Sequence, residues 1–287
     1  MALLAARGCE VLVPTRHAER ARDMLVLPTV EVVGANVHDA SVLHELLAGC
    51  DAAVNLVGIL HGSRDEFARI HVELPRKIAA ACHAQGVPRL LHMSALNADA
   101  GSRSGYLRSK GEGEAVIRAS GLQFSIFRPS VIFGRGDHFI NRFAALLGRL
   151  PLLPLACPGT RFQPVWVEDV ARVFAASLPR ADAIGQSYDL CGPQVYTLRQ
   201  VVEYVRDMAG RHALIVGLGN RLSYLQAWLF EHFPGKLLTR DDYYAMQVDS
   251  ICRCAFPFGM VPAPLAAVAC LADDLPLRHY FHYGAGN

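Results

Sequence analysis

Short apolar segments alternate with segments of helical pattern through the first two-thirds of the chain, and this alternation constrains the fold more than any other feature. Apolar, β-branched segments predict strands, and segments of helical apolar period that end at a glycine predict helices. The predicted strands are 9–15, 30–33, 52–57, 89–94 and 124–128, and the predicted helices are 40–48, 72–85 and 106–120. Because strands of a parallel sheet are buried on both faces, these continuous apolar runs indicate a doubly wound α/β fold.

The regular alternation ends after Pro129. Beyond it the pattern predicts a strand at 163–167, a helix at 167–178 and a strand at 187–190. From Tyr196 onward the chain is helical in pattern and rich in aromatic residues. A length of 287 residues suits one α/β domain with an appended lobe. We therefore expect an α/β domain over 1–187 and a smaller, mainly helical lobe over 188–287 that caps the site or binds substrate.

The charge balance excludes some classes of partner. The 28 Lys and Arg residues against 26 Asp and Glu give a net charge of +2, and both signs are spread along the chain. No basic stripe for a polyanion is visible, so the sequence argues against nucleic-acid binding. No run of eighteen apolar residues occurs, so we expect no transmembrane segment. These features predict a cytoplasmic protein, with peripheral attachment at the inner face of the membrane left open.

The eight cysteines stand singly, mostly in apolar stretches. This pattern predicts free thiols that act as small core residues in a reducing compartment. Cys252 and Cys254 are the one close pair, and they lack the second pair or histidine of a structural zinc site. We therefore expect no metal site.

Tyr106 and Lys110 are four residues apart in a predicted helix, and they therefore lie on one helix face. A nearby ammonium lowers the pKa of a phenol, which makes tyrosine a usable proton donor or acceptor. Ser94 ends the preceding predicted strand, at the sheet edge where doubly wound folds bind ligands, and its hydroxyl can hold a substrate carbonyl. The alternatives are a surface Tyr–Lys pair and a serine that caps the following loop.

Four motifs resemble those of the short-chain dehydrogenase/reductase superfamily, in its extended and atypical branches. They are Tyr106-x-x-x-Lys110, DAAVNLVG at 51–58, RPSVIFG at 128–134 and QPVWVEDV at 163–170. Three further segments, at 104–114, 133–143 and 238–242, resemble the NADPH-binding accessory subunit of respiratory complex I and its bacterial relatives. The resemblance extends from Cys9 to the C-terminus. It implies a Rossmann-like NAD(P)-binding domain over 1–187.

The resemblance also implies roles for individual residues. The catalytic set is Ser94, Tyr106 and Lys110, and the residues that contact the dinucleotide are Asn55, Gly58, Tyr106, Lys110, Arg128, Pro129, Ser130 and Arg16. The family reads the adenosine ribose at the end of its second strand, where this chain has Arg16, followed by Arg20 and Arg22. A guanidinium suits a 2′-phosphate, so NADP(H) is favoured over NAD(H). The alternative is a solvated arginine face on a short helix.

The sequence departs from the family pattern in two places. The phosphate loop T-G-x-x-G-x-x-G is missing, because Met1 already lies inside the segment that matches the first helix. We therefore expect the first strand to be absent. The sheet centre should then show either a gap or a direct pairing between strands 9–15 and 52–57, with reduced cofactor affinity. The second departure is the spacing of only 12 residues between Ser94 and Tyr106, which leaves the position of the catalytic serine open.

Three functions remain open from the sequence. The first is an NADPH-binding protein of the complex I accessory type, with a structural or regulatory role, little or no turnover, and complex I or another membrane-associated assembly as partner. The second is an active NADP-dependent reductase, dehydrogenase or epimerase. In that enzyme Tyr106 is the general acid/base, Lys110 lowers its pKa and binds the ribose, and Ser94 orients the reacting oxygen. The third is an interaction scaffold without cofactor. NADPH binding without turnover favours the first.

Overall fold

The chain folds into two compact units, each built from several stretches of sequence. The structure, a computed structural model, describes residues 1–17, 19, 21, 24–135, 137, 139–233 and 237–265. Unit 1 comprises Met1–Ser94, Ser109–Phe127 and Ala171–Tyr188, and unit 2 comprises Ala95–Arg108, Arg128–Val170 and Asp189–Asn287. The division after residue 187 that the sequence suggests stays a prediction.

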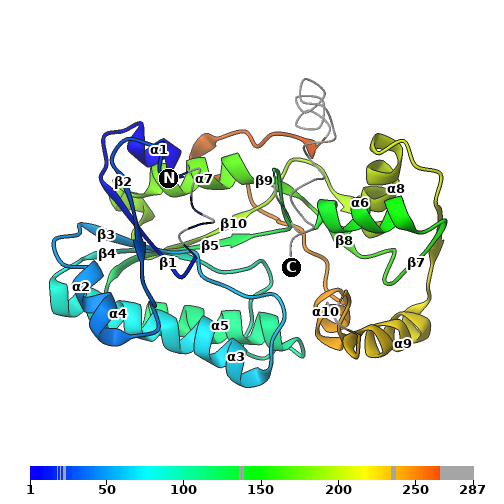
Figure 1. Cartoon of the computed structure of the whole chain (residues 1–287), viewed down its shortest axis with the longest axis horizontal. Coiled ribbons are helices and arrows are strands. Elements are labelled where there is room, and N and C mark those ends of the chain that lie inside the picture. Colours follow the sequence, from blue (N-terminus) through cyan, green and yellow to red (C-terminus); the bar gives the residue numbers. More distant parts are fainter. Residues whose placement is uncertain are drawn as a thin grey trace. The chain divides into compact units, whose positions relative to one another are not determined.

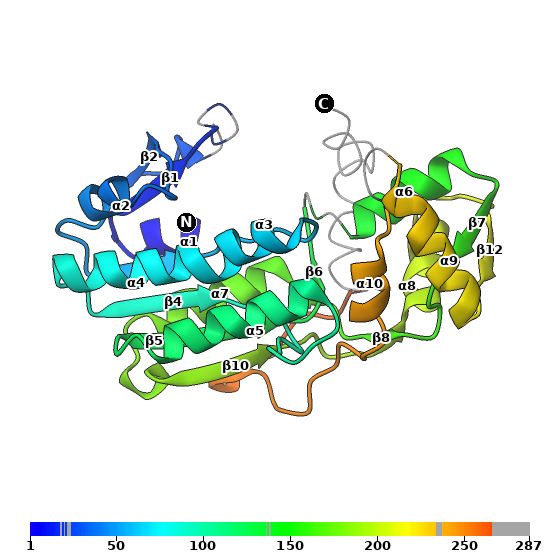
Figure 2. The ribbon, with the colours of Figure 1, turned by 90° about the horizontal axis from the view of Figure 1, so that it is seen from below.

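Unit 1 is organised around a four-stranded sheet in the order β10-β5-β4-β3 (Figure 1). Its strands are β3 (Ala52–Asn55), β4 (Arg89–Met93), β5 (Gln123–Pro129) and β10 (Gln186–Leu190). β4 pairs in parallel with both β3 and β5, as predicted. Helices α4 (Leu74–Gln85) and α5 (Gly105–Arg118) cover one face, and α7 (Val167–Ser177) covers the other (Figures 1 and 2). The sheet is therefore covered on both faces, which agrees with the apolar runs within β4 and β5.

Local sequence signals determine where the helices of unit 1 begin and end. Asp39 caps α2 (Ala40–Leu46) by accepting a hydrogen bond from the Ser41 amide. α3 (Arg64–Ala68) begins with a capping box, and a π-helical turn η2 (Arg69–Glu73) joins it to α4. α4 ends at Gly86, whose φ of 70° favours glycine. The core beneath these helices includes the buried side chains of Leu43, Leu74, Ile78, Cys82, Leu90, Ile117 and Ile126. Each large apolar side chain stabilises the fold by about 1.5–3 kcal/mol when buried.

The two N-terminal strands form a sheet of their own. β1 (Val11–Thr15) pairs in parallel with β2 (Val30–Gly34), and β1 shares no ladder with β3 among the strands that the structure describes. Of the two arrangements predicted for the sheet centre, the structure has the gap. Val54, Leu56 and Val57, in and just after edge strand β3, are exposed. α1 (Ala2–Ala5) precedes β1, and Arg7 after it donates a hydrogen bond to the Ala175 carbonyl in α7, with 2.6 Å between nitrogen and oxygen.

Unit 2 combines helices with short strand pairs. Its elements are β6 (Ile132–Phe133), α6 (Ile140–Arg149), β7 (Leu152–Leu155), β8 (Arg161–Phe162), β9 (Val165–Trp166), β11 (Tyr196–Thr197), α8 (Leu198–Met208), β12 (Leu214–Gly217), α9 (Asn220–Glu231), α10 (Arg240–Ala245) and η4 (Pro257–Gly259), whereas the short helix η3 (Ala181–Ala183) belongs to unit 1. α6 and α8 bury Leu147, Val202 and Val205 against β7 and β12. β12 pairs in parallel with β7, so the segment after Tyr196, expected to be mainly helical, also contains a strand.

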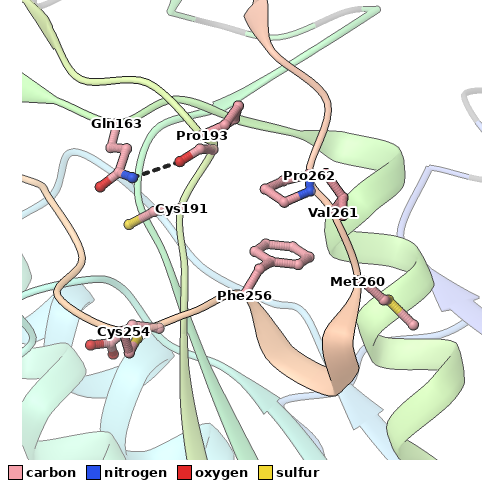
Figure 3. Close-up of a pocket in the computed structure, with 10 residues that line it drawn as sticks. Gln163, Cys191, Pro193, Cys254, Phe256, Met260, Val261 and Pro262 are labelled. Carbon is pink, nitrogen blue, oxygen red and sulfur yellow. Dashed lines mark hydrogen bonds between the residues drawn. The ribbon is translucent and has the colours of Figure 1, made fainter.

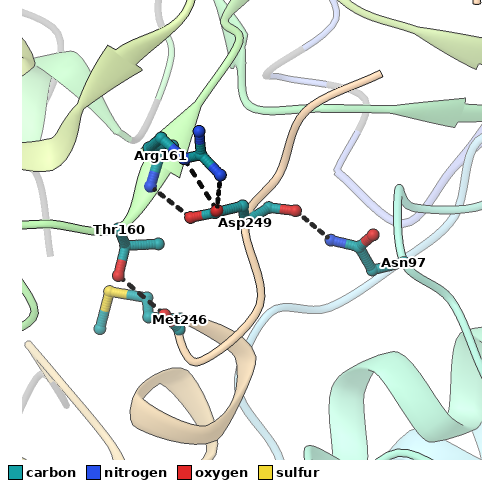
Figure 4. Close-up of polar contacts among 5 residues, drawn as sticks. All are labelled: Asn97, Thr160, Arg161, Met246 and Asp249. Carbon is teal, nitrogen blue, oxygen red and sulfur yellow. Dashed lines mark hydrogen bonds and ion pairs between the residues drawn. The ribbon is translucent and has the colours of Figure 1, made fainter. Parts of the chain in front are cut away.

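One polar cluster fixes the segment after α10 (Figure 4). Asp249 accepts hydrogen bonds from the Arg161 guanidinium, at 2.7 and 2.9 Å, and from the Arg161 amide, at 2.9 Å. The Asn97 amide donates to the Asp249 carbonyl at 3.0 Å, and Thr160 Oγ1 donates to the Met246 carbonyl at 2.7 Å. These contacts tie the segment to β8 and to the loop after β4.

The expectation that all cysteines are free was wrong. Cys191 and Cys252 form a disulfide between residues 61 positions apart, with a Cα–Cα distance of 5.9 Å. Sequence spacing does not indicate such a pair, because the fold brings its two segments together. Cys82 and Cys157 are free and buried, as predicted, whereas Cys254 is free and exposed. Within the described residues, no helix has the length and apolar character needed to cross a membrane.

Candidate functional site

Four residues predicted from the sequence gather in unit 1 around the carboxyl ends of β3 and β4. Lys110, only 5% exposed, donates a hydrogen bond from Nζ to the Met93 carbonyl at 3.2 Å. A Cβ added to Gly58 would lie 3.1 Å from this Nζ, so the glycine leaves room for the ammonium. Asn55 is buried beside His92, with 3.1 Å between Nδ2 and Nδ1. Ser94 follows directly after Met93. The structure therefore brings Asn55, Gly58, Ser94 and Lys110 into one region.

Two buried polar atoms in this region lack a partner. Ser94 is 3% exposed, and its Oγ makes no hydrogen bond within the part of the chain that the structure describes. The same holds for Nε2 of the buried His92. A buried polar atom without a partner costs about 1–3 kcal/mol, so such atoms occur where a bound molecule completes the hydrogen bonding. These residues fit a ligand that carries hydroxyl or carbonyl oxygens.

Burial sets the charges of this region. It lowers the pKa of Lys110 to about 8, and the Glu114 carboxylate partly opposes that shift. Burial first, and then the Lys110 charge, lower the pKa values of His71 and His92 to about 3. Both imidazoles are therefore neutral at pH 7, and Lys110 is the cation of the group.

His71 is a residue that the sequence analysis missed. Its Nε2 accepts a hydrogen bond from the Ile59 amide at 3.1 Å, so Nδ1 carries the ring proton and donates to Ser109 Oγ at 2.8 Å. The π-helical turn η2 holds this histidine, and such turns are frequent at functional sites. A Cβ added to Gly113 of α5 would lie 2.1 Å from the His71 carbonyl oxygen. A glycine within an otherwise regular helix was the sequence signal for this close approach.

Tyr106 belongs to unit 2 and lies in the first turn of α5, half-buried. Burial raises its pKa to about 12, so the predicted lowering was wrong in direction. The Tyr106 amide donates to Asp241 Oδ2 at 3.0 Å, and the Gly105 amide donates to Asp241 Oδ1. Asp241 thus caps the N-terminus of α5, a role that its place in the 238–242 motif did not indicate.

The Arg-Pro-Ser segment at 128–130 also lies in unit 2, where hydrogen bonds to main-chain atoms hold it in place. The Pro129 carbonyl accepts from the Leu96 amide at 2.9 Å, and Ser130 Oγ donates to the Ser250 carbonyl at 2.8 Å. Arg128 is half-buried. The roles predicted for these three residues toward the dinucleotide stay predictions.

Arg16 is exposed in unit 1, directly after β1. Burial lowers the pKa of the nearby His38, and the positive charges of Arg69, Arg16 and Lys77 lower it further. The Glu73 carboxylate opposes these charges, so three of the four charged groups that act on His38 are cations, an environment that favours a bound anion. Arg20 and Arg22 lie outside the described residues.

Comparison with known proteins shows what this chain resembles. Residues 1–138 match a family model described as NAD(P)H-binding. The fold is Rossmann-like. The NADPH-dependent quinone oxidoreductase of Escherichia coli, solved with NADPH, superposes with a TM-score of 0.74 at 18% identity and covers 94% of this chain and 93% of its own. The dTDP-glucose 4,6-dehydratase of Streptomyces venezuelae, solved with NAD, gives 0.65 at 24% identity, over 75% and 76% of the two chains.

The curated relatives include mitochondrial NADH dehydrogenase subunits. The chain is 33% identical over 218 residues to the mitochondrial NADH dehydrogenase (ubiquinone) 1 alpha subcomplex subunit 9 of Mus musculus. The match covers 72% of this chain and 57% of the mouse protein. The chain thus spans little more than half the length of its complex I relatives, and it is a homologue of this accessory subunit over that part.

Proposed function

We propose that this protein binds NADPH in preference to NADH and holds it in a structural or regulatory role, with little or no turnover. The observation that carries the proposal is the buried Lys110 ammonium in the space left by Gly58, beside the unpartnered Ser94 hydroxyl. Within the described residues the ammonium has one hydrogen-bond acceptor and the hydroxyl has none, so both are suited to the hydroxyl and carbonyl oxygens of a dinucleotide.

Preference for NADPH rests on Arg16. Its guanidinium lies among the charges that act on His38, together with Arg69 and Lys77. A 2′-phosphate gains charge-assisted hydrogen bonds there, whereas a 2′-hydroxyl gains little. Bound NADPH would supply hydride chemistry. The residues of this chain bind and orient it.

The pKa of Tyr106 supports a low turnover. With a pKa of about 12 the phenol keeps its proton at neutral pH, and it is a weaker acid than free tyrosine. General acid–base catalysis is most efficient when the pKa of the group lies near the working pH. NADPH retention therefore accords better with this site than rapid reduction. Homology to the complex I subunit supports a membrane-associated assembly as the partner.

An active reductase or epimerase is the second candidate. It is favoured by the presence of Ser94, Tyr106 and Lys110 in one chain, with Ser94 Oγ buried and unpartnered. In that enzyme a Tyr106→Phe variant loses about 10²–10⁴-fold in rate, because the proton donor is removed.

The test measures binding and turnover on the same protein. Calorimetry and ligand-observed NMR report NADPH and NADH affinities for the wild type, for Arg16→Ala and for Arg149→Ala, which removes the same charge from an exposed position in unit 2. Arg16→Ala should weaken NADPH binding at least about tenfold, because a charge-assisted hydrogen bond contributes about 1.5–3 kcal/mol. NADH binding, and the Arg149→Ala control, should not change. Substrate-dependent NADPH oxidation that Tyr106→Phe abolishes would instead establish the reductase, and absence of binding to either nucleotide would establish the scaffold.

A further inference from the structure

A second cluster of reactive side chains lies in unit 2, apart from the residues assigned to the dinucleotide. Asp189 and Cys191 lie at and after the end of β10, and Cys252 and Cys254 follow α10 by several residues. One carboxylate oxygen of Asp189 and the Sγ atoms of Cys252 and Cys254 all lie within 4.8 Å of one another. Cys191 belongs to the same cluster, because its Sγ is bonded to that of Cys252. Three sulfurs and a carboxylate therefore converge from two segments.

Gln163 holds these two segments together. Its side-chain Nε2 donates to the Gly192 carbonyl at 2.6 Å, and its Oε1 accepts from the Cys252 amide at 2.9 Å. Its main chain makes the same connection, since its carbonyl accepts from the Gly192 amide and its amide donates to the Ser250 carbonyl. A Cβ at Gly192 would lie 1.9 Å from the Pro164 carbonyl oxygen, so only glycine allows this close contact. The cluster is thus supported by a second layer of hydrogen bonds, as in built metal sites.

The sulfurs face a pocket (Figure 3). The pocket has a volume of about 240 Å³, and its lining includes Cys191 and Cys254 together with the apolar side chains of Phe256, Met260 and Pro262. Cys254 is exposed, so an ion can reach the sulfurs from solvent. Apolar walls lower the local dielectric constant and strengthen the attraction between thiolates and a cation.

We propose that reduction of the Cys191–Cys252 disulfide converts this cluster into a Zn²⁺ site whose ligands are the three thiolates and the Asp189 carboxylate. A dithiol or phosphine reductant supplies the two electrons that break the sulfur–sulfur bond, and the two sulfurs take up two protons. The dithiol becomes a disulfide and releases the two protons, whereas the phosphine takes an oxygen atom from water to become a phosphine oxide, and the same water molecule supplies the two protons. Zn²⁺ then displaces the protons of the three thiols. In the oxidised protein two of the sulfurs are bonded to each other, so metal and disulfide exclude each other.

The chemistry of the donors favours zinc. Thiolates are soft ligands that select Zn²⁺ over Mg²⁺ or Ca²⁺, and structural zinc sites are tetrahedral with Zn–S distances of about 2.3 Å. In such a tetrahedron neighbouring sulfurs are about 3.8 Å apart. The ligand atoms of Asp189, Cys252 and Cys254 already lie within 4.8 Å of one another, so side-chain rotations can bring these three to that geometry. Cys191 is held beside them by its bond to Cys252.

The test is a metal titration of the full chain in both redox states. Protein reduced with a phosphine and freed of metal is titrated with Zn²⁺ against a chromophoric chelator, and with Co²⁺ by absorption spectroscopy. The reduced protein should bind one Zn²⁺ per chain and give the thiolate charge-transfer and tetrahedral bands of Co²⁺, whereas the oxidised protein should not. Cys254→Ser and Asp189→Asn should each weaken Zn²⁺ binding at least about tenfold, and Gln163→Ala about 10–100-fold.

Two controls keep the test decisive. Cys9→Ser removes a free cysteine of unit 1 and should leave Zn²⁺ binding unchanged. Cys254→Ser keeps both disulfide cysteines, so its folding can be checked by thermal melting in the oxidised state. The proposal is overturned if reduced and oxidised protein bind Zn²⁺ equally, or if folded Cys254→Ser binds as tightly as Cys9→Ser. An octahedral Co²⁺ spectrum without charge-transfer bands would overturn it as well.

Discussion

Replacing Lys110 with methionine should stabilise the protein without cofactor and at the same time abolish NADPH binding. Burial lowers the pKa of Lys110 from 10.5 to about 8, so keeping this side chain charged at pH 7 costs the folded state about 3 kcal/mol. Methionine has a similar length and no charge to desolvate. The variant loses the hydrogen bond to the Met93 carbonyl, and this loss reduces the gain in stability by about 1 kcal/mol. The free energy of unfolding at pH 7 should therefore rise by about 1–2 kcal/mol.

The pH dependence makes this prediction specific. Between pH 8 and 10.5 the unfolded chain holds the Lys110 proton and the folded protein loses it, so wild-type stability rises with pH through this window. The extra free energy of unfolding of Lys110→Met relative to the wild type should be complete below pH 8 and disappear above pH 10.5. Urea unfolding of both proteins at several pH values measures this difference. Lys77→Met, which loses a 2.7 Å hydrogen bond to the His38 carbonyl, is the control and should not stabilise. A Lys110→Met protein destabilised at pH 7, or a difference independent of pH, would refute the reasoning.

Three further predictions follow from single contacts. Gly113→Ala should destabilise unit 1 by about 1–3 kcal/mol in chemical denaturation, because its Cβ would lie 2.1 Å from the His71 carbonyl oxygen; an unchanged midpoint would show that α5 shifts freely. Asp249→Asn should cost about 1 kcal/mol or less, because its ion pair with Arg161 is partly exposed. The Arg161 guanidinium lowers the pKa of Asp249, so this contribution is present at neutral pH and disappears as the pH falls through the folded-state pKa; acid titration of both proteins checks it. Tyr106→Phe should weaken NADPH binding about threefold to tenfold, because the phenol is expected to contact the dinucleotide and a lost hydrogen bond costs about 0.5–1.5 kcal/mol; an unchanged affinity by calorimetry would remove the phenol from the binding residues.

The strand and helix pattern of unit 1 could be predicted from the sequence because it is local. Residues 40–48 and 106–120 were predicted as helices, and the structure has them at Ala40–Leu46 and Gly105–Arg118. The spacing of apolar residues and the glycines that end helices depend only on neighbouring residues, so they can be recognised without knowledge of the tertiary fold. The roles of Asn55, Gly58 and Lys110 were expected from the family resemblance, and the place of Ser94 followed from the general rule that ligands bind at the carboxyl ends of parallel strands.

What the sequence could not indicate depends on contacts between distant segments. The Cys191–Cys252 disulfide joins residues 61 apart, and β12 is a strand because β7 lies beside it. The pKa of Tyr106 depends on burial, so the spacing to Lys110 predicted the wrong direction. His71 was missed because its role comes from a π-helical turn packed against Gly113.

The measurement that tests the central claim most directly is a paired titration of this protein with NADPH and NADH, repeated for Arg16→Ala. If Arg16 and Lys110 hold NADPH, this nucleotide should bind at least about tenfold more tightly than NADH. The reason is that a charge-assisted contact to the 2′-phosphate contributes about 1.5–3 kcal/mol. Arg16→Ala should then bring the two affinities together by weakening NADPH alone. Equal affinities for NADPH and NADH in the wild type, or an equal loss of both in Arg16→Ala, would contradict the account.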